Sequence, residues 1–253
     1  MVRVIMCGCN GKMGNVISEL AAKDSEVSIV AGVDLFAQQK FDYPVYESIL
    51  SCTEEADVVI DFSSTSRFEE RMEYILTHRL PIVLCTTGFS ENQLRQVKEA
   101  SEQVAVLRSA NMSLGVNVLM KLVAAAAKAF YGAGFDMEIV EKHHNQKVDA
   151  PSGTALALAD AMQKVLDEEY AYVYDRSGKR EKRAKNEIGI SSVRGGNIVG
   201  EHEVIFAGPD EVIELKHTAY SKAIFGNGAL QAAKFLKGKP AGMYNMGDVI
   251  GEV

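Results

Sequence analysis

The pattern of hydrophobic and polar positions alternates between two kinds of segment over the first 113 residues. Short runs rich in β-branched residues predict buried strands at 2–6, 27–33, 57–62, 82–85 and 104–107. Segments of helical character lie between them, at 12–22, at 66–78 and from Ser90, where Gln93 completes a capping box. Strands and helices in this alternating order predict an α/β domain with a doubly wound parallel sheet.

The pattern changes after about Asn111. Helices are expected at 114–130, 154–169 and 223–236, and a strand with one buried face at 135–142. Three further segments show near-alternation and predict an antiparallel set, at 188–193, 198–206 and 212–218, with a turn at 208–210. The charged stretch 177–186 predicts a mobile loop between them. The second part of the chain is therefore expected to be an α+β domain with a mixed or antiparallel sheet.

A glycine loop joins the first predicted strand to the first predicted helix. Gly8, Gly11 and Gly14 are spaced G-x-x-G-x-x-G, whereas the usual dinucleotide fingerprint is G-x-G-x-x-G. Glycine permits a tight turn and lets the backbone approach a pyrophosphate, whose charge meets the N-terminus of the helix. Because a strand precedes the loop and a helix follows it, we interpret it as a dinucleotide site rather than a structural turn.

Two charged residues near this loop bear on the cofactor. Asp34 ends the second predicted strand, twenty residues after Gly14. An acidic residue there accepts hydrogen bonds from the adenosine ribose and favours NAD. Lys12 lies at a helix start, where the helix dipole does not favour a cation, so we expect it to contact a ligand phosphate. The alternative is a solvated surface lysine, and use of NADH or NADPH stays open.

The stretch from Glu141 to Thr154 concentrates acid–base and anion-binding groups. His143 and His144 can exchange protons near neutral pH, and Lys147 supplies a cation or a proton. Pro-Ser-Gly-Thr at 151–154 begins a helix, where Gly153 permits close approach and Thr154 adds a hydroxyl. The coincidence predicts a site that binds an acidic small molecule and moves a proton on it, rather than a mere pair of packed histidines and a helix cap.

A zinc site is the competing interpretation of the two histidines. No third ligand has suitable spacing, so no metal is expected. The other three histidines lie inside helix or strand patterns and are interpreted as structural or exposed: His78, His202 and His217.

Composition narrows the class of protein. The 253 residues are 47% hydrophobic and 24% charged, as in an ordinary globular protein. A net charge of -7 argues against a general binder of nucleic acid or of anionic membranes, but allows a local basic cleft. The four scattered cysteines predict reduced thiols, and the apolar run at 4–7 is too short for a signal segment or membrane span. A cytoplasmic location is expected.

Several motifs together resemble the 4-hydroxy-tetrahydrodipicolinate reductase (dihydrodipicolinate reductase) family of lysine biosynthesis. They are the glycine loop, the stretch 141–156, Asp-Phe-Ser at 61–63, Thr-Thr-Gly-Phe at 86–89, the segment 109–117, Gly-Glu-His at 200–202 and Gly-Asn-Gly-Ala at 226–229. They occur in the family's order and span nearly the whole chain, and the His-His to Ser-Gly-Thr segment is highly specific.

The resemblance implies an NAD(P)H-dependent oxidoreductase of lysine and diaminopimelate biosynthesis that forms a homotetramer. Residues 1–113 would be a Rossmann-type dinucleotide-binding domain, completed by about 223–253, and 114–222 would bind substrate and form the oligomer interface. His143 would be the proton donor or acceptor, Lys147 a proton donor, and His144, Gly153 and Thr154 would contact a cyclic dicarboxylate. The implied cofactor contacts are Gly8, Cys9, Asn10, Gly11, Lys12, Met13, Asp34, Cys85, Thr86, Thr87, Ser109, Ala110, Asn111 and Met112.

The sequence departs from the family pattern at four positions. Cys85 stands where glycine is frequent, Met112 where phenylalanine is frequent, and Lys222 where arginine is common. Leu35 follows Asp34 where enzymes that prefer NADP tend to have arginine, which weakens any claim of strict NADP preference. The alternatives are another amino-acid-pathway dehydrogenase acting on a semialdehyde, and a non-catalytic NAD(P)-sensing protein.

Overall fold

The computed structural model describes residues 1–251, which form two compact units. Residues Met1–Ser113 and Ala223–Gly251 make the first unit, and Leu114–Lys222 make the second. The expected extension of the first part to residue 253 includes two residues that lie outside the described ones. Among residues 1–251, no helix is both long and apolar enough to cross a membrane.

The first unit contains a seven-stranded sheet with the order β12-β6-β5-β4-β1-β2-β3, in which every neighbouring pair is parallel. Its strands are β1 (Val2–Cys7), β2 (Val27–Val33), β3 (Val45–Tyr46), β4 (Val58–Asp61), β5 (Ile82–Leu84), β6 (Ala105–Arg108) and β12 (Gly242–Tyr244). The predicted doubly wound parallel sheet is confirmed. The strand order reverses between β1 and β4, and ligands of such sheets bind outside the carboxyl ends of the strands at this point.

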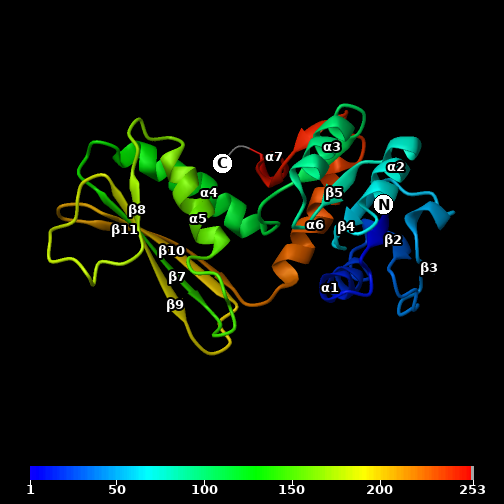
Figure 1. Ribbon diagram of the computed structural model, residues 1–253, viewed down its shortest axis with the longest axis horizontal. Helices are drawn as coiled ribbons and strands as arrows, with labels where there is room; N and C mark the ends of the chain where they lie inside the picture. The colour runs from blue at the N-terminus through cyan, green and yellow to red at the C-terminus, as the bar shows by residue number, and fades with distance from the viewer. Residues whose placement is uncertain (252–253) are drawn as a thin grey trace. The chain divides into compact units, whose positions relative to one another are not determined.

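Helices cover both faces of this sheet. They are α1 (Lys12–Ala21), α2 (Phe68–His78), α3 (Glu91–Ser101), α6 (Ala223–Leu236) and the short α7 (Met246–Ile250), with a 3₁₀ turn η1 (Ile49–Ser51). Phe68, Ile75 and Val97 of α2 and α3 pack into a core with strand residues such as Ile5 and Val59. Helix α6 contacts α1, β1, β4, β5 and β6, so the C-terminal segment packs against the first unit (Figure 1).

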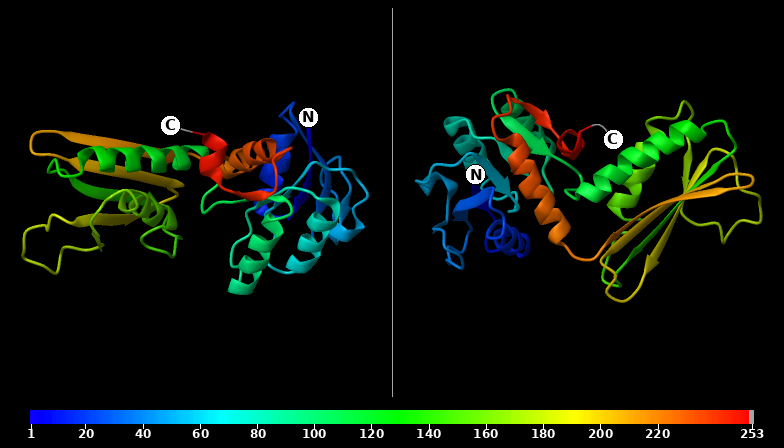
Figure 2. Two further views of the ribbon diagram at one scale, coloured as in Figure 1. Left: turned by 90° about the horizontal axis from the view of Figure 1, so that it is seen from above. Right: turned by 180° about the vertical axis from the view of Figure 1, so that it is seen from behind.

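The second unit is a mixed sheet with the order β11-β10-β7-β9-β8. Its strands are β7 (Asp136–His143), β8 (Ala171–Val173), β9 (Glu187–Arg194), β10 (Gly200–Ala207) and β11 (Val212–Ala219). The helices α4 (Leu114–Phe130) and α5 (Gly153–Gln163) pack against each other and on the same core (Figure 2).

The expected antiparallel set of three strands is only partly correct. β10 and β11 form an antiparallel hairpin around the predicted turn. β9 does not pair with β10, because β7 lies between them and runs parallel to β9. Alternation along a strand reports that one face is buried, and it carries no information about which strand is the neighbour.

The helix after the Pro-Ser-Gly-Thr turn is shorter than predicted. It ends at Gln163, whose side chain accepts a hydrogen bond from the Tyr170 N–H and donates one to the Glu168 carbonyl, both at 2.8 Å. These bonds turn the chain toward β8. Four short elements were not predicted, because a segment of two to five residues shows no clear period: β3, β8, β12 and α7.

The charged stretch 177–186 contains no helix or strand, as predicted. Arg183 nevertheless anchors it, with ion pairs to Asp136 at 2.8 Å and to Glu138 at 3.0 Å. Arg176, just before the stretch, pairs with Glu138 and Glu187. Its mobility stays a prediction.

Candidate active site

The glycine loop makes a tight turn between β1 and α1. Gly8 has φ +80°, and a Cβ there would lie 2.8 Å from the Phe62 carbonyl oxygen. A Cβ on Gly14 would lie 2.1 Å from the Gly8 carbonyl oxygen, so the first turn of α1 packs directly on the loop. No side chain caps α1. The geometry therefore fits a helix N-terminus that accepts an anionic group.

Asp34 follows β2 and is tied to the glycine loop. Its carboxylate accepts hydrogen bonds from the backbone N–H of Asn10 at 3.0 Å and of Phe36 at 3.2 Å. The Asn10 side chain in turn donates to the carbonyls of Phe36 and Gln38. The loop and the end of β2 are thus held as one frame, and the predicted positions of Gly8 and Asp34 are brought together.

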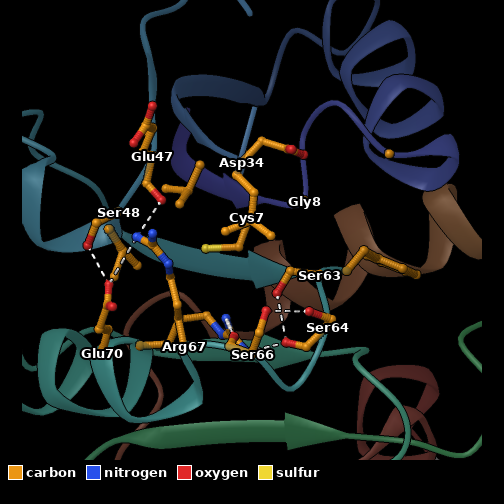
Figure 3. A pocket seen from close by; sticks show the side chains of 16 residues that line it. Cys7, Gly8, Asp34, Glu47, Ser48, Ser63, Ser64, Ser66, Arg67 and Glu70 are labelled. Carbon is orange, nitrogen blue, oxygen red and sulfur yellow. Dashed lines mark hydrogen bonds and ion pairs between the residues drawn. The ribbon is translucent and has the colours of Figure 1, made fainter. Parts of the chain in front are cut away.

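A cavity of about 200 Å³ lies beside this frame (Figure 3). Gly8, Gly11 and Asp34 line one side, and Ser66 and Arg67 line the other. It lies at the carboxyl ends of β1, β2 and β4, where the strand order reverses. We call it the Asp34 cavity; its position is that of a dinucleotide site.

A buried ion pair supports the wall of the Asp34 cavity. Asp61 at the end of β4 is fully buried, and its Oδ2 lies 3.0 Å from Nε of Arg71. Asp61 also accepts from the Ser63 N–H, while Arg71 donates to the carbonyls of Ser64 and Ser66. Arg71 was not predicted as part of the site. Helical spacing marks it only as one position of a charged helix.

A second cavity brings together two segments that the sequence separates by over twenty residues. Its lining includes Cys85, Thr86, Thr87, Ser109, Ala110, Asn111 and Met112, together with Phe225 of α6. Both segments follow strands of the same parallel sheet, β5 and β6, so their starts meet at one edge. All these residues belong to the first unit.

The remaining predicted cofactor contacts differ in what they can offer. Cys9 is buried under β2, and a Cβ on Gly32 would lie 2.7 Å from its Sγ, so Cys9 can contact a ligand only through its backbone. Burial raises the pKa of the Cys9 thiol to about 11. Burial also raises the pKa of Cys85 well above its ordinary value. Lys12 is exposed and Met13 is half-buried at the start of α1.

In the second unit, a buried carboxylate orients His143. Positions Met137, Ile139, Glu141 and His143 of β7 share the buried face. Glu141 is completely buried, and its Oε2 lies 2.5 Å from Nδ1 of His143. This contact leaves Nε2 of His143 as the ring atom that can exchange a proton with a ligand. Gly200 gives the ring its room, because a Cβ there would lie 3.1 Å from Nε2.

The Glu141 carboxylate is held ionised. Burial by itself raises its pKa, but hydrogen bonds from Arg194, Ser192, His143 and the Ser152 N–H outweigh burial and lower the pKa to about 2. Arg194 makes two parallel bonds to the carboxylate, at 2.7 and 2.8 Å. The carboxylate is therefore a permanent acceptor for the His143 ring.

His202, interpreted from the sequence as structural or exposed, belongs to the same cluster. It is 5% exposed on β10, its ring centroid lies 5.1 Å from that of His143, and its Nε2 lies 3.1 Å from Oγ of Ser152. Burial, followed by the charge of His143, lowers the pKa of His202 to about 4. His202 is thus neutral at neutral pH, and it packs beside the site without adding a charge.

The loop after β7 carries the predicted cation next to the helix N-terminus. The chain turns after His144, with the Lys147 N–H donating to the His144 carbonyl. Lys147 Nζ lies 2.8 Å from Oδ1 of Asp149. This hydrogen bond lowers the pKa of Asp149, and the Gly153 backbone N–H contributes in the same direction. Lys147, Gly153 and the start of α5 therefore surround one carboxylate already.

Four residues of this site were missed as participants: Glu141, Ser152, Arg194 and His202. A signal existed for Glu141, because strand alternation places it two residues before His143 on the same face. Ser152 was part of the predicted helix entry, and it caps α5 by accepting from the Ala155 N–H. Arg194 and His202 lie on other strands, and only the pairing of β7 with β9 and β10 brings them here.

Two family models match nearly the whole chain. The model described as dihydrodipicolinate reductase, N-terminus, matches residues 2–112, and the one described as dihydrodipicolinate reductase, C-terminus, matches residues 115–250. The chain belongs to the dihydrodipicolinate reductase family. The resemblance seen in its motifs is confirmed.

Individual relatives agree with this assignment. The chain is 54% identical over 252 residues to 4-hydroxy-tetrahydrodipicolinate reductase of Caldanaerobacter subterraneus subsp. tengcongensis, covering 99% of this chain and 98% of the relative. It is 51% identical to the enzyme of the same name from Clostridium tetani, covering 97% and 96%. A solved dipicolinate-bound dihydrodipicolinate reductase from Paenisporosarcina sp. TG-14 has a TM-score of 0.81 at 26% identity and covers 97% of each chain.

Membership of the dihydrodipicolinate reductase family makes the chain an NAD(P)H-dependent oxidoreductase of lysine and diaminopimelate biosynthesis. The semialdehyde dehydrogenase and the NAD(P)-sensing protein are not favoured, because both halves of the chain match the same reductase. The predicted Rossmann-type fold with a second mixed sheet is confirmed as well.

Proposed function

We propose that the chain reduces 4-hydroxy-tetrahydrodipicolinate to tetrahydrodipicolinate, using the two units described above. One observation carries the residue assignment: His143, oriented by a buried carboxylate, lies in the same unit as Lys147 and the N-terminus of α5. A proton donor beside an anion-binding helix end suits a substrate that carries carboxylates and must be protonated.

The first unit is the dinucleotide-binding part of the proposal. The glycine loop would hold the pyrophosphate at the start of α1, and Asp34 would accept from the adenosine ribose. The two cavities support this assignment. Gly8, Gly11 and Asp34 line the Asp34 cavity, and all seven residues of the segments 85–87 and 109–112 line the second cavity. The reduced nicotinamide supplies a hydride when bound.

The second unit is the substrate-binding part of the proposal. Lys147, His144, Gly153 and Thr154 would hold the two carboxylates of the ring. Support comes from Asp149, since Lys147 and the Gly153 N–H already interact with a carboxylate there. The name of the solved relative from Paenisporosarcina, bound to the cyclic dicarboxylate dipicolinate, agrees with such a ligand.

The chemistry requires one hydride, one proton and the loss of one water. Loss of the substrate's hydroxyl as water gives an α,β-unsaturated imine, and hydride addition to it leaves an enamine. One proton on the adjacent carbon then completes the reduction. We assign proton exchange to His143 through Nε2. Lys147 would act as a second proton donor, and its positive charge would also stabilise the dicarboxylate.

Consumption of NADH or NADPH in the presence of substrate tests the proposed reaction directly. The substrate is generated in the cuvette by the synthase that precedes this step, and a panel of amino-acid semialdehydes is assayed in parallel. We expect oxidation only with the synthase product. Turnover of a semialdehyde, or cofactor binding without any oxidation, would contradict the proposal.

Asp34 is expected to set cofactor affinity. Replacing it with Asn keeps the size of the side chain but removes the charge from the hydrogen bonds to the ribose. Loss of a charged hydrogen bond of about 1.5 kcal/mol raises KM for NADH about tenfold. KM for NADPH should rise less, because Asp34 repels a 2′-phosphate and Lys12 attracts it. Steady-state kinetics with both cofactors measure the ratio, and equal effects on both would contradict this role.

The proposal also includes a homotetramer in the cytoplasm. Helices α4 and α5 share the core on one face of the five-stranded sheet, and β11 at its edge leaves Val212 56% exposed and Ile213 36% exposed. Apolar side chains at a sheet edge suit contact with another copy of the chain. Light scattering coupled to gel filtration tests the assembly, and a monomer would contradict it.

A further inference from the structure

Arg194 connects two parts of the site described in the second unit. It is the last residue of β9 and lies in register beside His143 of β7. Its guanidinium binds both oxygens of Glu141, at 2.7 and 2.8 Å, and donates to the Asp149 carbonyl at 2.7 Å. One side chain therefore contacts the partner of His143 and the loop that carries Lys147.

The geometry at Glu141 explains why a planar cation is needed. Oε2 of Glu141 accepts hydrogen bonds from Nδ1 of His143 and Nη1 of Arg194. Oε1 accepts hydrogen bonds from the Ser152 N–H and from Nη2 of Arg194. A buried carboxylate without a cation becomes protonated and changes from acceptor to donor. The bidentate pair also fixes the plane of the carboxylate, and so the direction in which the His143 ring must point.

We propose that Arg194 is a positioning residue for the reduction, which keeps Glu141 ionised and in plane so that His143 presents Nε2 to the substrate. Through the Asp149 carbonyl it also fixes the Lys147 loop to the same frame. This inference rests on the proposed function. Arg194 itself touches neither the substrate nor the cofactor in this proposal, and acts through Glu141.

The charged and titratable groups around His143 define what the pH dependence reports. Glu141 and Arg194 face it from β7 and β9, and His202 from β10. Lys147 and Asp149 lie on the following loop, and His217 on β11 is the cross-strand neighbour of His202. Arg194 is the cation that keeps Glu141 ionised, so its removal raises the pKa of Glu141 and leaves a protonated carboxyl beside His143. The ionised form needed for activity then appears only at higher pH, so the acidic limb of the activity profile should move upward.

Three variants test the proposal: Arg194→Met, Arg194→Lys and, as a matched control, Arg183→Lys. Arg183 is an equally buried arginine that pairs with carboxylates at the other end of β7. We expect Arg194→Met to lower kcat about a hundredfold and Arg194→Lys about tenfold, because small misplacements of a reacting group cost this much. The acidic limb of kcat against pH should move upward in Arg194→Met alone, with KM for NADH unchanged in all three.

A double-mutant cycle with Glu141→Gln separates positioning from general support of the fold. If Arg194 acts through Glu141, adding Arg194→Met to Glu141→Gln lowers kcat little further. Independent, multiplicative losses would overturn the proposal. So would a kcat within threefold of the unmodified protein, or an unshifted pH profile, in a folded Arg194→Met variant.

A spectroscopic measurement makes the inference testable apart from turnover. NMR of the histidine-labelled protein should show a slowly exchanging Nδ1 proton on His143 in the unmodified protein and in Arg183→Lys. That proton signal should be lost in Arg194→Met, and its persistence there would overturn the proposal. A protein that shows the signal but reduces no substrate would instead contradict the proposed function alone.

Discussion

Replacing Lys147 with Ala is expected to lower kcat about a thousandfold while NADH still binds. The loss combines a proton donor with the positive charge that holds a carboxylate, and general acid catalysis alone supplies factors of about 10² to 10⁴. NADH affinity persists because all proposed cofactor contacts belong to the first unit. Steady-state kinetics give kcat, and fluorescence titration of NADH gives the affinity.

Lys142 provides the matched control for this experiment. It precedes His143 on β7, so its side chain leaves the opposite face of the sheet, where it pairs with Glu201 at 3.3 Å. Lys142→Ala should keep kcat within a few-fold. If Lys147→Ala also stays within a few-fold of the unmodified protein, the role assigned to Lys147 is wrong.

Replacing Glu141 with Gln is expected to lower the free energy of unfolding at pH 7 by about 3 kcal/mol. The change leaves Arg194 with a neutral partner at a site where Glu141 is completely buried, and breaking a buried pair typically costs this much. Urea unfolding, followed by far-UV circular dichroism, measures the difference.

The loss of stability in Glu141→Gln should also depend on pH. The folded-state pKa of Glu141, about 2, lies below the ordinary 4.5, so its ionised form stabilises the fold above about pH 4.5. That contribution is lost as the pH falls toward 2, and the loss reaches about 2 kcal/mol by pH 3. Glu141→Gln lacks this group, so the difference in stability between the two proteins should shrink from pH 7 to pH 3.

Glu99 shows what an ordinary surface carboxylate does. It pairs with Arg95 on the exposed side of α3 at 3.7 Å, and both side chains are largely solvated. Glu99→Gln should change the free energy of unfolding by less than about 0.5 kcal/mol at either pH. An equally small effect of Glu141→Gln would show that the buried cluster does not stabilise the fold as we infer.

Local features were predictable where neighbouring residues in the chain decide them. The strand Val27–Val33 and the helices Leu114–Phe130 and Ala223–Leu236 have the predicted bounds, because each carries a clear period. The capping box of Ser90 and Gln93 is present as expected, since both partners lie within one turn. The predicted end of α5 was wrong, because hydrogen bonds from the Gln163 side chain to the following segment decide where the helix ends.

By itself, the sequence determined the alternating elements of the first unit, the glycine loop with Asp34, and the stretch of His143, Lys147 and Gly153 that resembles one reductase family. The tertiary structure alone decided that Arg194, 53 residues away, holds Glu141, and that β7 separates β9 from β10. Periodicity records which face of an element is buried. Which other strand covers that face depends on long-range packing, and the protonation state of a carboxylate depends on that packing too.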